Sequence, residues 1–594
     1  MEPRNGRRPR DEAVSAKEPR RPSNFDELRF KPQKPVQWFS PGVLGASALR
    51  VAINATFGEY LDKRELQGSI DAGPLLHHAD KDEIWIDYIS DTGDGFASTY
   101  SVAWLAARER LVVEGSELPR ADVVVLGGDE VYPIGGAEAY ENRFIGPYEA
   151  SLPWLPADNP EMYFVAGNHD WYDGLTAFTR SFCQGGWIGA RRTRQTRSYF
   201  ALQLPHRWWL WGLDIQFNSY IDEPQLRYFE HVVGLMREGD RVILCTAVPS
   251  WTHAADEKAF YKLGYVEHHL IGGAKAELTL TLSGDSHHYA HYLGDSGGTH
   301  KITAGGGGAF LHGTNDLHEH VELHPDKDPQ VGSQRFDLGP CYPDRGTSRS
   351  LALGAVTLPL KNPSFVAVPA AMYLLLGWSV EFGLRAFPGR LSRLDQSGAA
   401  FGWLDGLVGL GRNPVSVLLV LALLGATYGF AKPPDRWMRR KVPAKAAMGV
   451  AHTVLHLLVF VTSMWLAVHA CRALGLQGAG FTAASLATLT VLGAVLGSLV
   501  MGAYLAFCCA VLNAHGNEAF SAMGRMGYKN FLRLHIDAQG VLHVYPLGLR
   551  RATKNWRPDP DNTAEASWLA PASEAETPKT HFIEAPFTIE GRKQ

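Results

Sequence analysis

The pattern of apolar and polar residues changes character near residue 360. Before that point, short apolar segments at 84–89, 123–126, 162–166, 242–245 and 278–282 alternate with turns rich in glycine and aspartate and with amphipathic stretches. Short apolar segments bounded by such turns are typical of strands, and amphipathic stretches between them of helices. The pattern therefore predicts an α/β domain, which we place at residues 36–345.

Four long apolar runs follow, at Phe365–Leu384, Pro414–Ala431, Ala446–Ala470 and Phe481–Leu512. A helix needs roughly 20 apolar residues to cross a bilayer, so each run qualifies, the second only just. We predict an all-α transmembrane bundle of about four helices within residues 360–515. Gly493 and Gly497 form a small-xxx-small pattern, which lets helices pack closely.

The runs hold few ionisable residues, namely Glu381, His452, His456 and His469. Because polar groups at membrane depth tend to be functional, one interpretation is a pathway or a haem site. The simpler interpretation is polar packing toward the inside of the bundle.

The two ends of the chain lack long apolar runs. Residues 1–35 are rich in Arg, Lys, Glu and Pro, which predicts a disordered tail and not a signal peptide. Residues 516–594 are predicted to form a β-containing tail. Within it, Asn530–Leu549 reads as a hairpin, because alternating residues flank a turn at Ala538-Gln539-Gly540.

Charges in the loops predict an orientation. Lys432–Lys445 holds six Lys and Arg residues, whereas Cys471–Gly480 holds only Arg472. Because loops rich in Lys and Arg stay in the cytoplasm, we expect an integral protein of the inner or plasma membrane. With four spans, the N-terminal domain and the C-terminal tail would both be cytoplasmic.

Composition narrows the classes of function. A net charge of -4 argues against electrostatic binding of nucleic acid, so no nucleic-acid partner is expected. The six cysteines are scattered and form no CxxC pair, which fits free thiols in a reducing compartment.

Metal-binding residue types follow the ends of four apolar segments. The motifs are Asp91-Thr92-Gly93, Gly128-Asp129-Glu130-Val131-Tyr132, Gly167-Asn168-His169-Asp170 and Gly284-Asp285-Ser286-His287. Strand ends of an open α/β sheet converge on one edge, where ligands bind. Carboxylate, amide and imidazole groups suit Mn, Fe or Zn, and the glycines allow close approach of the backbone. The spacing therefore predicts a metal site at this edge.

With these motifs, residues 83–314 resemble a calcineurin-like metallophosphoesterase domain. Asp91-x-Gly93 with Gly128-Asp129-x-x-Tyr132 is similar to the purple acid phosphatase variant, and the stretches 160–174, 198–205 and 305–312 resemble membrane-anchored members. The resemblance implies an αββα sandwich of two sheets, followed by the transmembrane bundle. It also implies hydrolysis of a phosphate mono- or diester by metal-activated hydroxide, with two cations roughly 4 Å apart.

The resemblance also implies roles for single residues. Six side chains would bind the two metals: Asp91, Asp129, Tyr132, Asn168, Asp285 and His287. Asp91, Tyr132 and His287 would hold the first metal, Asp129 would bridge, and Asn168 would hold the second. His169 would stabilise or protonate the leaving oxygen, with Asp170 orienting its ring.

Two positions depart from the family pattern. Asp285 replaces the first His of Gly-His-x-His, and an Asp still binds a hard metal. Ala247 stands where the family has a His ligand of the second metal, and Ala cannot bind one. His253 and His312 are candidate substitutes, without which the second site is weak or is filled only with substrate.

Several questions of function stay open from the sequence. The membrane anchor suggests a phosphorylated substrate at the lipid bilayer, such as a phospholipid or a lipid-linked pyrophosphate. A degenerate phosphoesterase fold that only binds its ligand, or a transporter or sensor with a regulatory soluble domain, are the alternatives. The cluster Arg191, Arg192, Arg194 and Arg197 contacts a phosphate group in one interpretation and is a solvated loop in the other.

Overall fold

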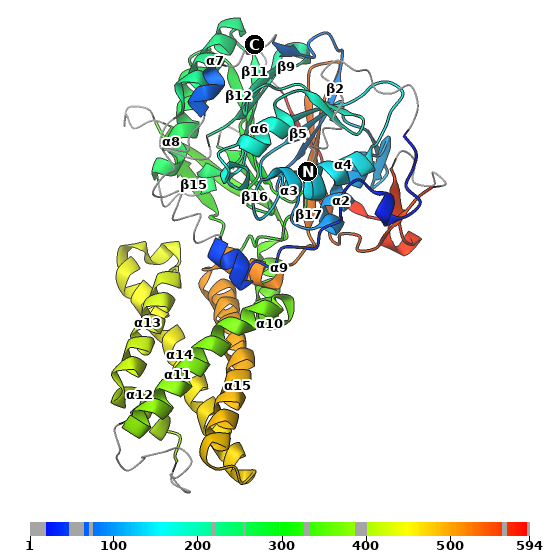
Figure 1. Cartoon of the computed structure of the whole chain (residues 1–594). Helices are drawn as coiled ribbons and strands as arrows, with labels where there is room; N and C mark the ends of the chain where they lie inside the picture. Colours follow the sequence, from blue (N-terminus) through cyan, green and yellow to red (C-terminus); the bar gives the residue numbers. More distant parts are fainter. Residues whose placement is uncertain are drawn as a thin grey trace. The chain divides into compact units, whose positions relative to one another are not determined.

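The computed structural model describes residues 19–46, 64–69, 75–215, 221–252, 257–295, 298–325, 332–386, 401–560 and 567–590. The chain divides into two compact units (Figure 1). The first unit comprises the described residues up to 36, between 49 and 345, and from 525 onward, and the second comprises 37–48 and 346–524. Each unit is described by itself below.

Two nine-stranded sheets form the centre of the first unit in its described residues. The first sheet has the order β1 (Leu76–His77), β9 (Phe200–Gln203), β10 (Trp208–Leu213), β11 (Arg241–Thr246), β12 (Glu277–Ser283), β14 (His300–Ala304), β13 (Tyr289–Gly294), β16 (Gln334–Tyr342) and β15 (His320–Leu323). The second has the order β21 (Thr580–Phe582), β18 (Leu542–Leu549), β17 (Lys529–Ile536), β2 (Ile84–Ile89), β5 (Val123–Leu126), β6 (Glu161–Phe164), β8 (Arg191–Thr193) and β7 (Gly186–Ile188), with β22 (Phe587–Ile589) beside β18. Two short hairpins, β3 (Arg110–Val113) with β4 (Ser116–Pro119) and β19 (Trp556–Pro558) with β20 (Leu569–Pro571), lie outside the sheets.

Helices cover the outer faces of the paired sheets. One buried cluster joins residues of both sheets, such as Ile86 and Leu534 with Leu210 and Leu280, so the sheets pack face to face. The other face of the second sheet packs against α2 (Phe96–Ala106), α3 (Ala137–Tyr140), α4 (Gly146–Ser151) and α6 (Thr176–Phe182). The other face of the first sheet packs against α7 (Glu223–Leu235) and α8 (Glu257–Tyr265) (Figure 1). The predicted αββα sandwich is confirmed.

The N-terminal and C-terminal segments both contribute to this unit. Within the range predicted as a disordered tail, Leu28 and Phe30 are buried in the core of the helix-covered face, while residues 1–18 lie outside the described residues. The predicted hairpin of the C-terminal segment is present as β17 and β18. It lies inside the second sheet, since β17 pairs with β2 in antiparallel register, with Arg533 opposite Asp87. Residues 346–524 of the second unit are therefore inserted between β16 and β17 of one folded unit.

The second unit is helical. Its helices are α9 (Arg345–Ala352, whose first residue belongs to the first unit), α10 (Leu358–Lys361), α11 (Ala367–Ala386), α12 (Asp405–Arg412), α13 (Pro414–Phe430), α14 (Lys441–Ala473), α15 (Gly478–Phe507) and α16 (Gly516–Met523). In the described residues, three helical segments at 363–384, 441–473 and 478–512 are long and apolar enough to cross a membrane. The second predicted run forms α13, which qualifies only together with α12, across a bend of 101°.

Packing inside this unit follows the sequence pattern. A Cβ on Gly493 would lie 2.5 Å from the Tyr373 ring, so α15 approaches α11 closely at the predicted small-residue site. The side chains of Glu381, His452 and His456 are buried. The His452 ring stacks on Tyr504, with ring centroids 4.0 Å apart. These polar groups therefore face the inside of the helical unit.

Candidate metal centre

The predicted ligands lie at strand ends of both sheets. Asp91, Asp129 and Asn168 follow the parallel strands β2, β5 and β6, whose carboxyl ends meet at one edge. Asp285 and His287 follow β12 of the other sheet, and the Asp285 N–H donates to Asp91 Oδ2 at 2.9 Å. Asp91, Asp129 and Asp285 have φ values of 59°, 52° and 62°. Left-handed backbone at residues other than glycine is strained, and it gathers at functional sites.

Four of the six predicted ligands converge at the hydroxyl of Tyr132. This hydroxyl lies 2.8 Å from Asp91 Oδ1, 3.3 Å from Asp129 Oδ2 and 3.0 Å from His287 Nε2. All four side chains are almost fully buried. Within the described parts of the chain, no three His, Cys, Asp or Glu side chains are placed to hold a metal ion by themselves, so the set depends on the tyrosine oxygen. With that oxygen included, the donors are of the kinds that Mn, Fe and Zn accept.

The electrostatics of this cluster favour a bound cation. Burial, and then the neighbouring Asp285, raise the pKa of Asp91 well above its usual value. Burial, and then Asp170, have the same effect on the pKa of Asp129. Burial lowers the pKa of His287 well below its usual value, which keeps the imidazole neutral, the form that binds metals. Buried carboxylates that repel one another are stabilised by a positive ion, so the residues fit a divalent metal.

A backbone contact sets the orientation of the His287 ring. Its Nδ1 donates to the Phe310 carbonyl at 2.7 Å, which leaves Nε2 directed at the Tyr132 hydroxyl. Such a contact fixes the tautomer of a metal-binding histidine. His312, a candidate substitute for the second metal, stacks on His287 with ring centroids 3.9 Å apart, beside a predicted ligand of the first metal.

A second ion has fewer donors. Asn168 Oδ1 is buried and has no hydrogen-bond partner among the described residues, while Nδ2 donates to the Tyr172 hydroxyl at 3.4 Å. A buried oxygen without a partner is costly, and a cation would satisfy it. A Cβ on Gly128 would come within 3.0 Å of the Ala247 methyl, so the position of the missing histidine adjoins the Asp129 loop. The other candidate substitute, His253, lies outside the described residues.

His169 lies at the site, but a different residue holds its ring from the one predicted. Its Nδ1 donates to the Pro133 carbonyl at 2.7 Å, and burial lowers the pKa of His169 to about 4. Asp170 Oδ2 instead accepts from the N–H groups of Gly167 and Asp129, each at 2.9 Å. An acid in the first turn of a helix reaches back to free N–H groups, and Asp170 stands in that position of α5 (Asn168–Trp171). Asp170 therefore fixes two ligand loops, and the Pro133 carbonyl is the partner of His169 Nδ1.

Glycines at two positions allow the strand ends to meet. A Cβ on Gly167 would lie 2.2 Å from Asp129 Oδ1, and one on Gly284 would lie 2.5 Å from Asp91 Oδ2. Either methyl group would displace a predicted ligand. The glycines predicted from the motifs are therefore needed for close approach.

Sequence reasoning missed a residue of the C-terminal hairpin. Lys529 is the first residue of β17, three residues before Leu532, which pairs with Tyr88 of β2. Lys529 is fully buried. Burial lowers the pKa of Lys529 to about 8, and the negative charges of Asp94 and Asp91 oppose this shift. No motif marks this lysine, because a hairpin pattern does not say which strand the hairpin joins.

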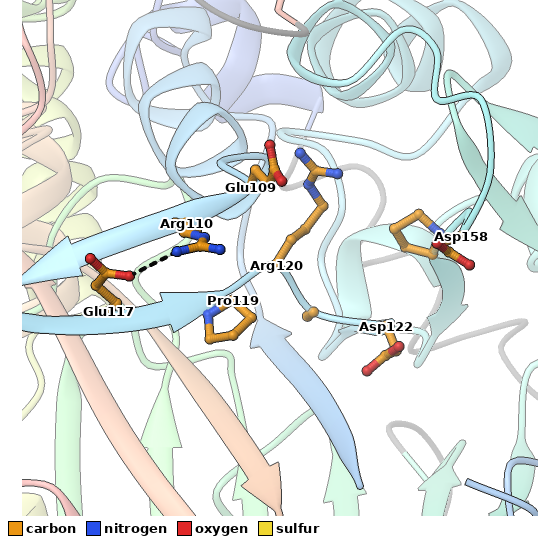
Figure 2. Close-up of a pocket in the computed structure, with 9 residues that line it drawn as sticks. Glu109, Arg110, Glu117, Pro119, Arg120, Asp122 and Asp158 are labelled. Atoms are coloured by element: carbon orange, nitrogen blue, oxygen red, sulfur yellow. Dashed lines mark hydrogen bonds and ion pairs between the residues drawn. The ribbon is translucent and has the colours of Figure 1, made fainter.

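Two other features lie apart from the metal centre. A cavity of about 450 Å³ is lined by the β3–β4 hairpin and by residues such as Asp122 and Pro160, which precede β5 and β6 (Figure 2). It is therefore at the opposite ends of the strands that carry Asp129 and Asn168. In the basic cluster, Arg191 is buried and donates to the Tyr148 carbonyl, and Arg194 pairs with Glu161 at 2.7 Å. Both arginines have structural contacts.

Comparison with known proteins agrees with this geometry. Residues 84–289 match the family model of the calcineurin-like phosphoesterase, and this range contains all six predicted ligands. This part of the chain is a calcineurin-like phosphoesterase domain, as the motifs predicted. No curated protein matches the chain. One similar solved structure is described as GAP50, the anchor in the inner membrane complex of Plasmodium; it is 11% identical with a TM-score of 0.30, and the match covers 46% of this chain and 94% of that one. A TM-score this low establishes no shared fold.

Proposed function

We propose that this chain is a metal-dependent phosphoesterase that its helical unit anchors in a membrane. The observation that carries the proposal is the convergence of Asp91, Asp129 and His287 on the Tyr132 hydroxyl, at the strand ends of a calcineurin-like phosphoesterase domain. When bound there, divalent cations would polarise the phosphoryl oxygens of a phosphate mono- or diester.

The residues of the chain would divide the tasks of binding. Asp91, Tyr132 and His287 would hold the first ion, Asp129 would bridge, and Asn168 and Asp285 would hold the second. Since the Pro133 carbonyl is the partner of His169 Nδ1, we assign contact with the substrate to Nε2. Asp170 would keep the Asp129 and Asn168 loops in place during turnover.

Membrane anchoring is supported by the position of the helical unit in the sequence, where residues 346–524 separate two parts of the first unit. Strands β16 and β17 belong to one folded unit, and the second unit separates them in sequence. A folded unit lies on one side of a membrane, so the chain must cross an even number of times between them. Four crossings meet this requirement and three do not, so we assign the fourth crossing to α13, which is about 25 Å long at 1.5 Å per residue. The basic loop 432–445 then lies on the side of the phosphoesterase domain, which the charge rule assigns to the cytoplasm.

This topology is tested by labelling single cysteines from one side of sealed vesicles. A cysteine at Gly475 is expected to react from the side opposite to one at Ser573, because an odd number of crossings separates the two positions. Reaction of both from the same side would refute four crossings.

Proximity to the bilayer also supports a lipid-linked phosphate as the substrate class. Hydrolysis of a soluble ester in preference to the same headgroup in vesicles would contradict that choice.

A second candidate function is a phosphoesterase fold that binds a phosphorylated ligand without turnover. Ala247 favours it, because this position adjoins the Asp129 loop and offers no ligand. Hydrolysis of bis-p-nitrophenyl phosphate and p-nitrophenyl phosphate with added Mn²⁺ distinguishes the two functions.

The expected result is hydrolysis by the wild type that Asp129→Asn abolishes. Asp158→Asn, at an exposed carboxylate near the opposite strand ends, is the matched control and should leave the rate unchanged. Equal background rates in the wild type and in Asp129→Asn, with every divalent metal tried, would refute the enzyme and leave the binding function.

A further inference from the structure

The strand that follows the membrane unit in sequence holds the glycine-rich loop of the metal centre. Three hydrogen bonds join residues 525–530 to the loop 305–311. They run from Lys529 Nζ to the Ala309 carbonyl, from the Asn530 N–H to the Gly306 carbonyl at 3.1 Å, and from the Leu311 N–H to the Arg525 carbonyl at 2.8 Å. The first of these bonds comes from a side chain, that of Lys529, which is fully buried, and the other two are between backbone groups.

The same loop holds two of the proposed metal ligands. The Ala309 N–H donates to the carbonyl of Asp91 at 2.8 Å, and the Phe310 carbonyl accepts from His287 Nδ1 at 2.7 Å. The Phe310 N–H in turn donates to Asp94 Oδ2 at 3.1 Å. The ammonium of Lys529 thus bonds to the peptide unit that joins Ala309 and Phe310. Ala309 contacts Asp91, and Phe310 contacts His287.

We propose that Lys529 is a positioning residue of the metal centre. This role for Lys529 rests on one part of the proposed function, namely that a metal binds between Asp91 and His287. A buried ammonium is costly without negative neighbours, and here Asp94 and Asp91 stabilise it. Lys529 holds the Ala309 carbonyl in place, and the neighbouring Phe310 carbonyl orients the His287 imidazole toward the proposed metal position.

The sign of a change in metal affinity separates this role from plain charge compensation. A positive charge near the site repels a cation, so removing it would by itself tighten metal binding. Loss of a residue that positions a metal ligand typically weakens metal binding by roughly 10- to 100-fold. A positioning role therefore predicts a change opposite to the Coulombic one.

The experiment is a calorimetric titration of Co²⁺ into metal-stripped, full-length protein in nanodiscs. We expect Lys529→Met to weaken Co²⁺ binding at least roughly tenfold. The matched control is Lys301→Met, at a second fully buried lysine that pairs with Glu267 beside the rings of Trp251, Phe260 and Phe336. It should lower the melting temperature and leave Co²⁺ affinity within about twofold, since its ammonium pairs with Glu267 and is not bonded to a carbonyl of the loop.

Unchanged or tighter binding by Lys529→Met would overturn the proposal, as would an equal loss in Lys301→Met. If Lys529→Met does not fold, Ala309→Gly loosens the same loop without altering any charge, and a loss of several-fold in affinity is expected. Wild-type affinity in that variant would equally overturn the role. A wild type that takes up no Co²⁺ would refute the metal centre itself, whereas Co²⁺ uptake without hydrolysis would leave Lys529 its role and refute only the enzyme.

Discussion

Replacing Arg533 by Met tests whether the C-terminal hairpin is a structural part of the phosphoesterase domain. Arg533 lies on β17, directly opposite Asp87 on β2. Its Nε and Nη2 donate to the two carboxylate oxygens at 2.7 and 2.8 Å, and both side chains are fully buried. Nη1 also donates to the Leu118 carbonyl at 3.2 Å. Since β2 leads into Asp91, this pair joins the hairpin to the strand that presents a proposed metal ligand.

The free-energy cost of Arg533→Met follows from the burial and geometry of the ion pair between Arg533 and Asp87. Met fills much of the volume but leaves the Asp87 carboxylate in the sheet without its partner. Breaking a buried ion pair from one side costs about 3–5 kcal/mol. Two hydrogen bonds to a charged group, at about 1.5–3 kcal/mol each, give a similar sum. At 1.4 kcal/mol per factor of ten, the population of the opened hairpin should rise by roughly 10²- to 4 × 10³-fold.

Limited proteolysis of the full-length protein measures this population when opening is faster than cleavage. Cleavage within the hairpin should accelerate by roughly 10²-fold or more in Arg533→Met. Arg335→Met is the control, because its pair with Asp337 is about half exposed and such pairs contribute about 0.2–1 kcal/mol. The double variant Arg533→Leu with Asp87→Leu should recover much of the loss, since no unpaired charge remains. A cleavage rate in Arg533→Met close to that of the control would refute the reasoning.

Three further predictions concern pH and the ligand loops. Burial, and then the neighbouring His291, lower the pKa of His300 to about 4. Because the unfolded chain then protonates His300 more readily than the folded chain does, the stability of the fold should decrease as the pH drops from 6.5 toward 4. Melting temperatures at pH 7 and pH 5 measure this decrease, which should be smaller in His300→Gln. Gly167→Ala should reduce Mn²⁺-dependent hydrolysis by roughly 10²-fold, because the added methyl group displaces the Asp129 carboxylate. Gly136→Ala is the control and should not reduce the rate, because the space around its added carbon is open. Equal rates in the two variants would contradict the close approach of Gly167 to Asp129. Ala247→His should raise the number of Mn²⁺ ions bound per chain, measured by elemental analysis after gel filtration, and an unchanged number would show that this position does not face the second ion.

The sequence predicts the site well where ligand and strand are neighbours in the chain. Asp91, Asp129 and Asn168 each follow an apolar segment directly, so the convergence of strand ends follows from the general geometry of α/β sheets. The glycines beside them are recognisable for the same reason. These are local relations, and the structure keeps them.

Relations across the chain are not readable in this way. Alternation in Phe531–Ile536 predicts a strand, but both of its faces are buried, so the pattern does not show that Arg533 and Lys529 face carboxylates. Asp87 lies 446 residues from Arg533 in sequence, and the Ala309 carbonyl that Lys529 contacts lies 220 residues away, both before the inserted helical segment. The contact of Asp170 with the N–H groups of Gly167 and Asp129 is equally hidden, because it depends on how two loops fold against each other.

The central claim is that these strand ends form a metal centre, and anomalous diffraction from crystals soaked in Mn²⁺ tests it most directly. The account predicts a strong peak within bonding distance of Asp91, Asp129, Tyr132 and His287, and a weaker peak, or none without a phosphate analogue, beside Asn168 and Ala247. Diffraction data of good quality that show no anomalous peak at the Tyr132 hydroxyl would contradict it.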